Sequence, residues 1–245
     1  MLTADGLLSW FQRLHTPEQT RTTIDHIRSS APSRRVAGGR SNVSGRYPSK
    51  KMGVTIQFES HRVELAGIYE MEHDAGVLEY FDQPPSIKLD YESLGGRPMG
   101  VLHTPDFFVI RETEAGWEEW KTEEDLGCLS ERNSNRYCTG DGRWRCPPGV
   151  AYAERLGLYY RVRSSAEIDG IFQRNIQFLE DYFRAGSKEL LPAIRETAVA
   201  HVTATPGLPL EDLLRITEET ITPDDIFAMI AAGVLYVDLR AAPLS

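Results

Sequence analysis

Two strand-like segments joined by a short polar turn constrain the fold of this chain more than any other feature. Residues 102–110 and 116–121 are rich in the residues that favour β-strands, which predicts a β-hairpin. The first segment contains Asp106 directly after a proline, and the second ends with Glu119 and Lys121. The hairpin therefore brings acidic and basic side chains from separate strands together.

Strand geometry decides which of these side chains share a face. Side chains two positions apart point the same way, so Glu119 and Lys121 lie on one face and Glu118 on the other. A turn near residues 112–115 places Asp106 opposite Lys121, with Glu119 on the diagonal. Diagonal neighbours are about 7–8 Å apart, which allows two carboxylates to reach one cation.

These residue types suit the hydrolysis of a phosphodiester, which needs an activated water and neutralised phosphate charge. Divalent ions supply both, and carboxylate oxygens favour Mg²⁺, with Mn²⁺ as a substitute. Lys121 can hold a phosphate oxygen or orient the attacking water. The motif by itself also fits an ordinary hairpin with a charged edge.

An upstream helix strengthens the nuclease interpretation. Residues 60–73 are predicted to be helical and contain Glu64. Helix, strands and carboxylate-bearing hairpin occur in the order of a restriction-endonuclease-like PD-(D/E)xK core, an α/β fold. The predicted catalytic residues are Glu64, Asp106, Glu119 and Lys121, and the predicted metal ligands are the three carboxylates among them.

The segment 29–51 is rich in Ser, Gly, Pro and basic residues. It fits either a solvated linker or a basic arm that orders on DNA phosphates. Residues 1–60 hold nine Lys and Arg against four Asp and Glu, although the chain carries a net charge of −9. The predicted DNA-binding residues are Arg34, Arg35, Arg40, Arg46, Lys50 and Lys51.

Composition narrows the class of protein. No run of about 18 apolar residues is present, so a membrane span is not expected, and the first residues do not resemble a secretory signal. The odd set Cys128, Cys138 and Cys146 argues against a disulfide scaffold and favours a reducing cytoplasm. A zinc site built on these cysteines is the less favoured alternative, because their spacing is loose.

Three segments organise the chain: N-terminal helices and a basic arm (1–50), the nuclease domain (51–187) and a C-terminal winged-helix-like domain (188–245). Thr16 is predicted to cap a helix that runs to about residue 28, and residues 126–149 to form a long loop. Further helices are predicted at 7–14, 151–156 and 168–184, and strands at 77–81, 87–91 and 159–162. The last domain is predicted to contain helices at 192–202, 208–216 and 222–232, followed by a strand at 234–239.

Several motifs in this order resemble the TnsA endonucleases of heteromeric bacterial transposons. The likeness covers about residues 46–185 and is carried by FESHRVEL (58–65), YEMEHD (69–74), YFDQP (80–84), HTPDF (103–107), EWK (119–121), YRVR (160–163) and NIQFL (175–179).

The resemblance implies an enzyme that cleaves the 5′ ends of a transposon in double-stranded DNA. Its implied partners are a DDE transposase of the TnsB type, separate or fused, and an AAA+ ATPase regulator of the TnsC type. It also implies that Glu64 is the helix carboxylate, Asp106 and Glu119 are metal ligands and Lys121 is the catalytic lysine. RNA-guided and protein-guided targeting both fit the resemblance.

Two other functions fit the same sequence. One is a stand-alone restriction- or resolvase-type nuclease with this core, and the other is a non-catalytic DNA-binding or scaffold protein. The histidines His61, His73 and His103 are predicted to be structural, although His103 could lie near the scissile phosphate. Trp117 and Trp120 are predicted to pack in the core or at a sheet edge.

Overall fold

The structure, a computed structural model, describes residues 1–34, 44–184, 190–217 and 220–244. The chain divides into two compact units, Met1–Ile168 and Asp169–Ser245, each with its own hydrophobic core. The first unit combines helices with a mixed sheet, which confirms the α/β class, and the second is helical. No helix in these ranges is long and apolar enough to cross a membrane.

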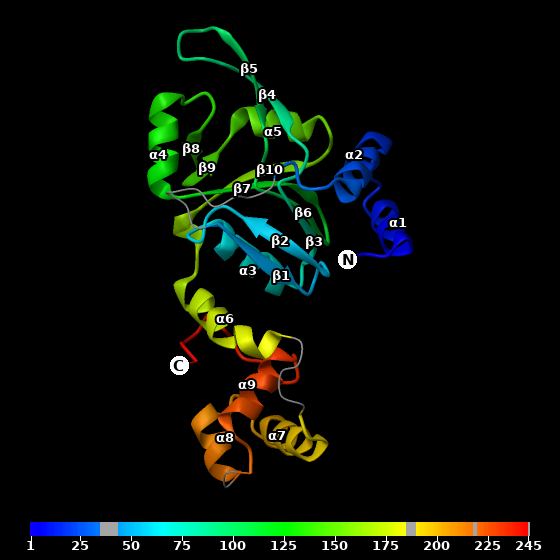
Figure 1. The fold of residues 1–245 in the computed structure, drawn as a ribbon, viewed down its shortest axis with the longest axis vertical. Helices are drawn as coiled ribbons and strands as arrows, with labels where there is room; N and C mark the ends of the chain where they lie inside the picture. The colour runs from blue at the N-terminus through cyan, green and yellow to red at the C-terminus, as the bar shows by residue number, and fades with distance from the viewer. Residues whose placement is uncertain (35–43, 185–189, 218–219, 245) are drawn as a thin grey trace. The chain divides into compact units, whose positions relative to one another are not determined.

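A four-stranded sheet organises the first unit (Figure 1). Its order is β10-β7-β6-β3, with β10 parallel to β7 and the other neighbours antiparallel. A parallel pair needs a long crossover, and residues 122–158 supply it. The strands are β3 (Val77–Asp82), β6 (Phe107–Arg111), β7 (Ala115–Lys121) and β10 (Tyr159–Ser164).

Two helices cover opposite faces of this sheet: α3 (Glu64–His73) and α5 (Pro147–Glu154). Trp120 of β7 packs against Gly67 of α3, where an added Cβ would lie 2.6 Å from the indole ring. Trp117 packs against Tyr152 of α5, with ring centroids 5.5 Å apart. Because the two tryptophans are three positions apart, they point to opposite faces. Both are buried, as predicted.

The N-terminal helices α1 (Ala4–Arg13) and α2 (Glu18–Ser29) belong to the core of the first unit, so the predicted boundary at residue 50 does not separate them from it. The Trp10 indole donates a 2.8 Å hydrogen bond to the carbonyl of Arg111. Arg28 forms a 2.7 Å ion pair with Glu79, which is fully buried. The predicted cap at Thr16 is wrong, because Pro17 occupies the N-cap position and no side chain caps the helix.

Three hairpins complete the first unit. They are β1 (Gly45–Ser49) with β2 (Val54–Phe58), β4 (Ile87–Glu92) with β5 (Pro98–His103), and β8 (Cys138–Gly140) with β9 (Arg143–Arg145). The predicted strand 102–110 is therefore two strands in different sheets, because the segment before Asp106 contains a proline that cannot donate to a ladder. The last part of the predicted arm 29–51 contains strand β1.

The predicted loop 126–149 is also largely ordered. Helix α4 (Glu123–Arg132) is capped by Thr122, whose hydroxyl accepts a hydrogen bond from the Asp125 N–H. The hairpin β8–β9 turns at Asp141 and Gly142, both with positive φ, which is the backbone that a two-residue hairpin turn needs. Both features have local sequence signals, a capping residue and an Asp-Gly pair, that the prediction did not use.

The second unit contains α6 (Gly170–Phe183), α7 (Pro192–Ala204), α8 (Leu210–Ile216) and α9 (Pro223–Ala231). Helix α6, which the prediction assigned to the nuclease domain, packs on α9 through Phe178 and Phe227, with ring centroids 4.8 Å apart. Thr222 caps α9 as predicted.

The predicted strand 234–239 is wrong, because the structure shows no strand there. The N–H groups of Val234 and Leu235 bond instead to the carbonyl of Met229. Downstream, the buried Asn175 amide donates to the carbonyls of Leu239 and Ala242. The described part of this unit therefore lacks the strand that a wing requires.

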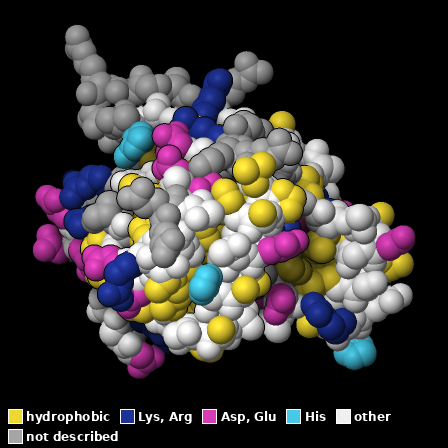
Figure 2. Space-filling view, turned by 90° about the horizontal axis from the view of Figure 1, so that it is seen from below, with side chains coloured by type: hydrophobic (Ala, Val, Ile, Leu, Met, Phe, Trp, Pro, Cys, Tyr) yellow, Lys and Arg dark blue, Asp and Glu magenta, His cyan; other side chains and the backbone are white. Residues whose placement is uncertain are grey.

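Over the face drawn in Figure 2, hydrophobic and charged side chains are interspersed.

Candidate active site

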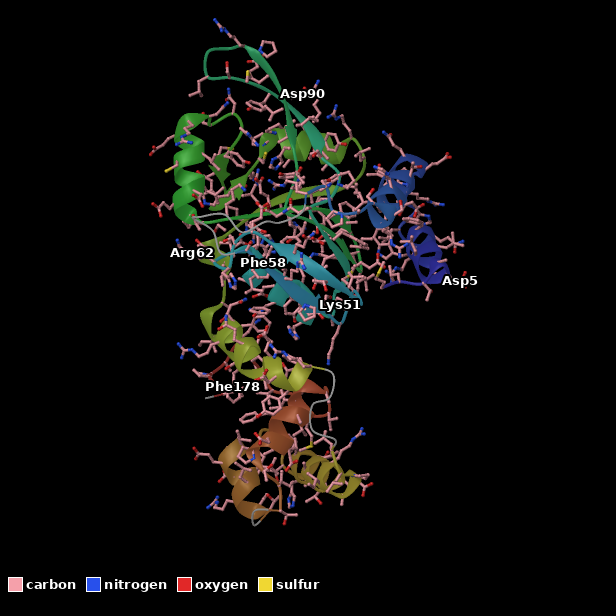
Figure 3. All side chains as sticks on the ribbon, in the orientation of Figure 1. Asp5, Lys51, Phe58, Arg62, Asp90 and Phe178 are labelled. Atoms are coloured by element: carbon pink, nitrogen blue, oxygen red, sulfur yellow. The ribbon has the colours of Figure 1, made fainter. Side chains whose placement is uncertain are left out.

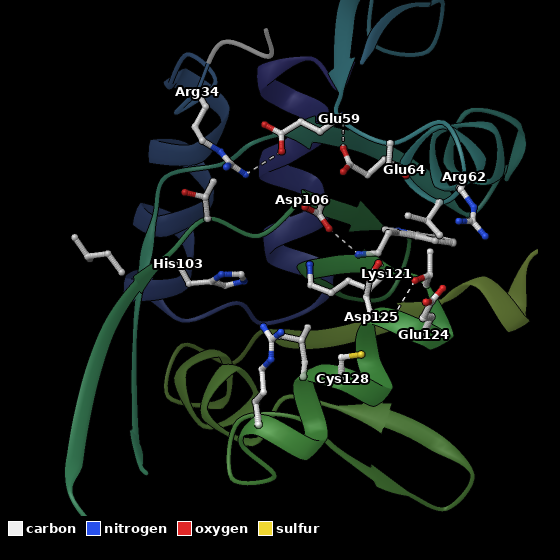
Figure 4. A pocket seen from close by; sticks show the side chains of 18 residues that line it. Arg34, Glu59, Arg62, Glu64, His103, Asp106, Lys121, Glu124, Asp125 and Cys128 are labelled. Carbon is white, nitrogen blue, oxygen red and sulfur yellow. Dashed lines mark hydrogen bonds and ion pairs between the residues drawn. The ribbon is translucent and has the colours of Figure 1, made fainter. Parts of the chain in front are cut away.

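A cavity of about 840 Å³ brings together three of the four predicted catalytic residues: Glu64, Asp106 and Lys121 (Figure 4). Glu64 is the first residue of α3, Asp106 lies in the link between β5 and β6, and Lys121 ends β7. Helix α4 forms a further wall. Segments that are distant in the sequence thus converge on one polar pocket.

Asp106 ties the two strands of the hairpin together at the pocket. Its Oδ2 accepts a 2.7 Å hydrogen bond from the backbone N–H of Trp120. The ladder pairs Phe107 with Glu118, so the next position places Asp106 against Glu119. The predicted register, with Asp106 opposite Lys121, is wrong.

The physical reason is the tightness of the turn. Ile110 pairs with Ala115, and the Arg111 N–H bonds to the Glu114 carbonyl at 2.8 Å. Only two residues therefore lie at the tip of the hairpin, and the pairing shifts by two positions from the one expected. A shift of two keeps each side chain on its predicted face.

The negative charges of Glu64 and Asp106 repel each other, so ionisation of both carboxyl groups is unfavourable without a cation. Burial, followed by the charge of Asp106, raises the pKa of Glu64 to about 8. Burial is also the main cause that raises the pKa of Asp106, while the nearby Lys121 acts in the opposite direction. Both side chains are buried, with 6% and 7% of their surface exposed.

Each of these two carboxylates uses one oxygen in a backbone hydrogen bond. Glu64 Oε2 accepts from the Glu59 N–H at 2.8 Å, and Asp106 Oδ2 accepts from Trp120. Among the described residues, no hydrogen-bond partner is found for the other oxygen of either group. A hard divalent cation would relieve the repulsion and use those oxygens, so this pair fits Mg²⁺ or Mn²⁺. No group of three or more His, Cys, Asp or Glu in the described ranges is arranged to hold a metal.

Lys121 keeps its positive charge in this setting. Burial opposes the charged form, but Asp106 and Glu119 outweigh it and raise the pKa of Lys121. Its Nζ lies 2.8 Å from Glu119 Oε1, and a quarter of the side chain is exposed. An ammonium group at the pocket surface suits contact with a phosphate oxygen.

Glu119, the fourth predicted catalytic residue, is fully buried and does not line the cavity. Besides Lys121, its carboxylate accepts hydrogen bonds from Tyr137 at 2.9 Å and Tyr160 at 2.8 Å, and His103 Nε2 lies 3.4 Å away. Although burial disfavours the charged form, Lys121 and His103 lower the pKa of Glu119 overall. The arrangement makes Glu119 the buried counter-ion of Lys121.

His103 lines the cavity, but both of its ring nitrogens have partners in the protein. The Tyr160 hydroxyl donates to Glu119, so it accepts from His103 Nε2 at 3.0 Å. Arg136 Nη2 lies 3.3 Å from Nδ1 and donates to it. His103 is therefore held as part of the network around Glu119, which supports the predicted structural role.

Glu118 lies on the opposite face of β7, as the alternation of side chains predicts. It is fully buried and bonds to Arg111 at 2.9 Å and Tyr159 at 3.1 Å. Arg163 Nη1 lies 3.6 Å from its other oxygen. Glu118 therefore belongs to a separate ionic network.

The predicted DNA-binding residues have different surroundings. Lys51 donates to the carbonyls of Met71, Asp74 and Val77, so its ammonium joins the end of α3 to the start of β3. Figure 3 labels Lys51 at the turn between β1 and β2. Arg34 lines the cavity, donates a hydrogen bond to Gln83 and forms a 3.7 Å ion pair with Glu59. The remaining members are Arg46 and Lys50, which are exposed, and Arg35 and Arg40, which lie outside the described residues.

The sequence also singled out three cysteines and the histidines His61 and His73. Cys128 is exposed on α4, Cys138 is half-buried and Cys146 is buried, all three as free thiols. His61 packs edge-on against Phe58. Burial lowers the pKa of His73 to about 4.

Sequence reasoning missed the two tyrosines that hold Glu119. Tyr137 precedes β8, and Tyr160 lies on β10 beside Trp117, its register partner on β7. No local pattern reveals that a strand 40 residues later runs parallel to β7. Comparison of the chain with models of protein families and with curated proteins gives no match.

Proposed function

We propose that this chain is a divalent-metal-dependent DNA endonuclease with a restriction-endonuclease-like PD-(D/E)xK core. The observation that carries the proposal is the convergence of Glu64, Asp106 and Lys121 on one cavity. Two buried carboxylates with raised pKa values and a charged lysine are the groups that metal-assisted phosphodiester hydrolysis needs.

Each residue has a distinct role in this proposal. Glu64 and Asp106 would hold Mg²⁺, or Mn²⁺ in its place. When bound, the ion would neutralise phosphate charge and lower the pKa of a water molecule. Lys121 contacts a non-bridging phosphate oxygen, and Glu119 holds the lysine in place through the 2.8 Å ion pair.

The substrate we propose is the 5′ end of a transposon in double-stranded DNA. This part of the proposal rests on the resemblance of the ordered motifs to the TnsA endonucleases, and it includes a DDE transposase and an AAA+ ATPase regulator as partners in the bacterial cytoplasm. Glu64, Asp106 and Lys121 belong to three of these motifs, and all three line the cavity.

The test is DNA cleavage by Asp106→Asn, with Asp82→Asn as the matched control. Asp82 is equally buried at the end of β3 and accepts a backbone hydrogen bond from Gln57, but it does not line the cavity. Nicking of supercoiled plasmid with Mn²⁺ is measured with and without the transposase. We expect Asp106→Asn to lose at least about a hundredfold in rate and Asp82→Asn to stay near wild type.

The outcomes separate the rival functions. Cleavage that survives Asp106→Asn contradicts the proposal. Cleavage of any plasmid by the isolated chain favours a stand-alone nuclease, whereas cleavage only with the transposase favours the transposon role. Retained DNA binding without divalent-ion binding in calorimetry favours a non-catalytic protein.

A further inference from the structure

Two arginines at the cavity have no role in the chemistry described above. Arg62 lies in the link before α3, two residues from Glu64, and Arg132 is the last residue of α4. Both side chains are exposed. Among the described residues, neither forms an ion pair or hydrogen bond through its side chain. The other Lys and Arg residues that line the cavity do, because Arg34 pairs with Glu59 and Lys121 with Glu119.

The two arginines line the cavity from different elements. Val63 is buried beside Arg62 and anchors the link, and Figure 4 shows Arg62 on the far side of the carboxylate pair from Arg34. On α4, the cavity-lining residues recur at helical spacing: Asp125, Cys128, Leu129 and Arg132. One face of α4 therefore forms the wall, and Arg132 is at its end.

The spacing along this wall fits a DNA strand. Seven residues of helix span about 10 Å, so Arg132 lies about 10 Å along α4 from Asp125. That length is close to the rise of three nucleotides, at about 3.4 Å each along one strand. The start of α4 follows Lys121 directly, and Arg132 lies at the other end of the helix.

We propose that Arg62 and Arg132 bind the phosphates that flank the cleaved phosphate of the DNA strand. Guanidinium groups suit this task because they donate two parallel hydrogen bonds to phosphate oxygens. The inference rests on the proposed function, because it assigns the strand to the same cavity. It adds two contacts that the basic N-terminal segment does not include.

The test measures binding of a fluorescent duplex oligonucleotide by anisotropy, with Ca²⁺ in place of Mg²⁺ to limit cleavage. The variants are Arg62→Ala, Arg132→Ala and the corresponding lysine substitutions. The charge-matched control is Arg13→Ala, an exposed arginine on α1 that does not line the cavity. Circular dichroism verifies that each variant is folded.

We expect each alanine variant to bind about tenfold more weakly at low salt. The slope of log affinity against log salt concentration should fall by about one for each arginine removed. The lysine variants should keep the slope, because the charge remains, but bind more weakly than wild type. Arg13→Ala should match wild type in both measurements.

Unchanged affinity and salt slope in both Arg62→Ala and Arg132→Ala would overturn the inference, while Mn²⁺-dependent nicking by wild type would leave the nuclease function standing. Loss of binding in these variants, with no nicking by wild type under any condition, would support the arginine contacts and contradict the nuclease function. Absence of duplex binding by wild type would contradict the inference directly.

Discussion

Asp106 accepts a 2.7 Å hydrogen bond from the backbone nitrogen of Trp120, the residue between Glu119 and Lys121. This contact fixes the carboxylate relative to the end of β7. The two neighbours of Trp120 differ in their surroundings: Lys121 lines the cavity, whereas Glu119 is fully buried and does not line it.

Because other side chains enclose Glu119, we expect it to contribute little to metal binding. Glu119→Gln should change Mn²⁺ affinity by less than about threefold, because its carboxylate is enclosed by Tyr137, Tyr160 and Lys121. Asp106→Asn, the same change of acid to amide, should weaken Mn²⁺ binding by more than about tenfold. Calorimetric titration measures both. Equal losses of Mn²⁺ affinity in the two variants would show that Glu119 is a ligand.

We expect the adjacent residues Lys51 and Lys50 to differ in role: Lys51 should stabilise the fold, and Lys50 should contribute to DNA binding. Lys51→Gln loses three charge-assisted hydrogen bonds to carbonyls and should lower the free energy of unfolding by about 2 kcal/mol, without changing the salt dependence of DNA binding. Lys50→Gln, on an exposed side chain, should change stability by less than about 0.5 kcal/mol. It should lower the salt slope instead. Urea unfolding and anisotropy titrations measure the two properties, and the reverse pattern would refute the assignment.

Alanine substitutions at Gly67 and Gly127 should change the stability of the protein in opposite directions. Gly67→Ala places a Cβ 2.6 Å from the Trp120 ring and should destabilise the protein by about 1–3 kcal/mol. It should also slow cleavage, because Trp120 holds Asp106. In Gly127→Ala, on α4, the new Cβ meets nothing within 4 Å, so about 0.5–1 kcal/mol of stabilisation is expected. Thermal unfolding compares them, and a neutral Gly67→Ala would contradict the tight packing of α3 on β7.

The Glu118 network should matter for stability and not for chemistry. Glu118→Ala leaves Arg111 without its buried partner and should cost about 3 kcal/mol of unfolding free energy. Glu114→Ala breaks a pair with Arg161 that is more than a third exposed, and it should cost at most about 1 kcal/mol. Denaturant unfolding measures both. Cleavage per folded molecule should stay unchanged in each variant, so a specific loss of rate in Glu118→Ala would place this residue in the catalytic machinery.

The sequence by itself determined the features that depend on near neighbours. Alternation along β7 assigned Lys121 to one face and Glu118 to the other, and the cap at Thr222 marked the start of α9. The same local reasoning was wrong at residues 234–239, because a strand forms only when another strand offers its edge.

Only the tertiary structure decided how these pieces meet. The two-residue turn set Asp106 against Glu119, and the parallel pairing of β10 brought Tyr160 over the Glu119 carboxylate. The α4 wall with Arg132 likewise depends on how the crossover packs beside β7. Strand registers and the burial of a carboxylate by tyrosines arise from contacts between residues far apart in the chain. Residue types and spacing therefore identified the acidic and basic groups, whereas packing decided which of them face the cavity.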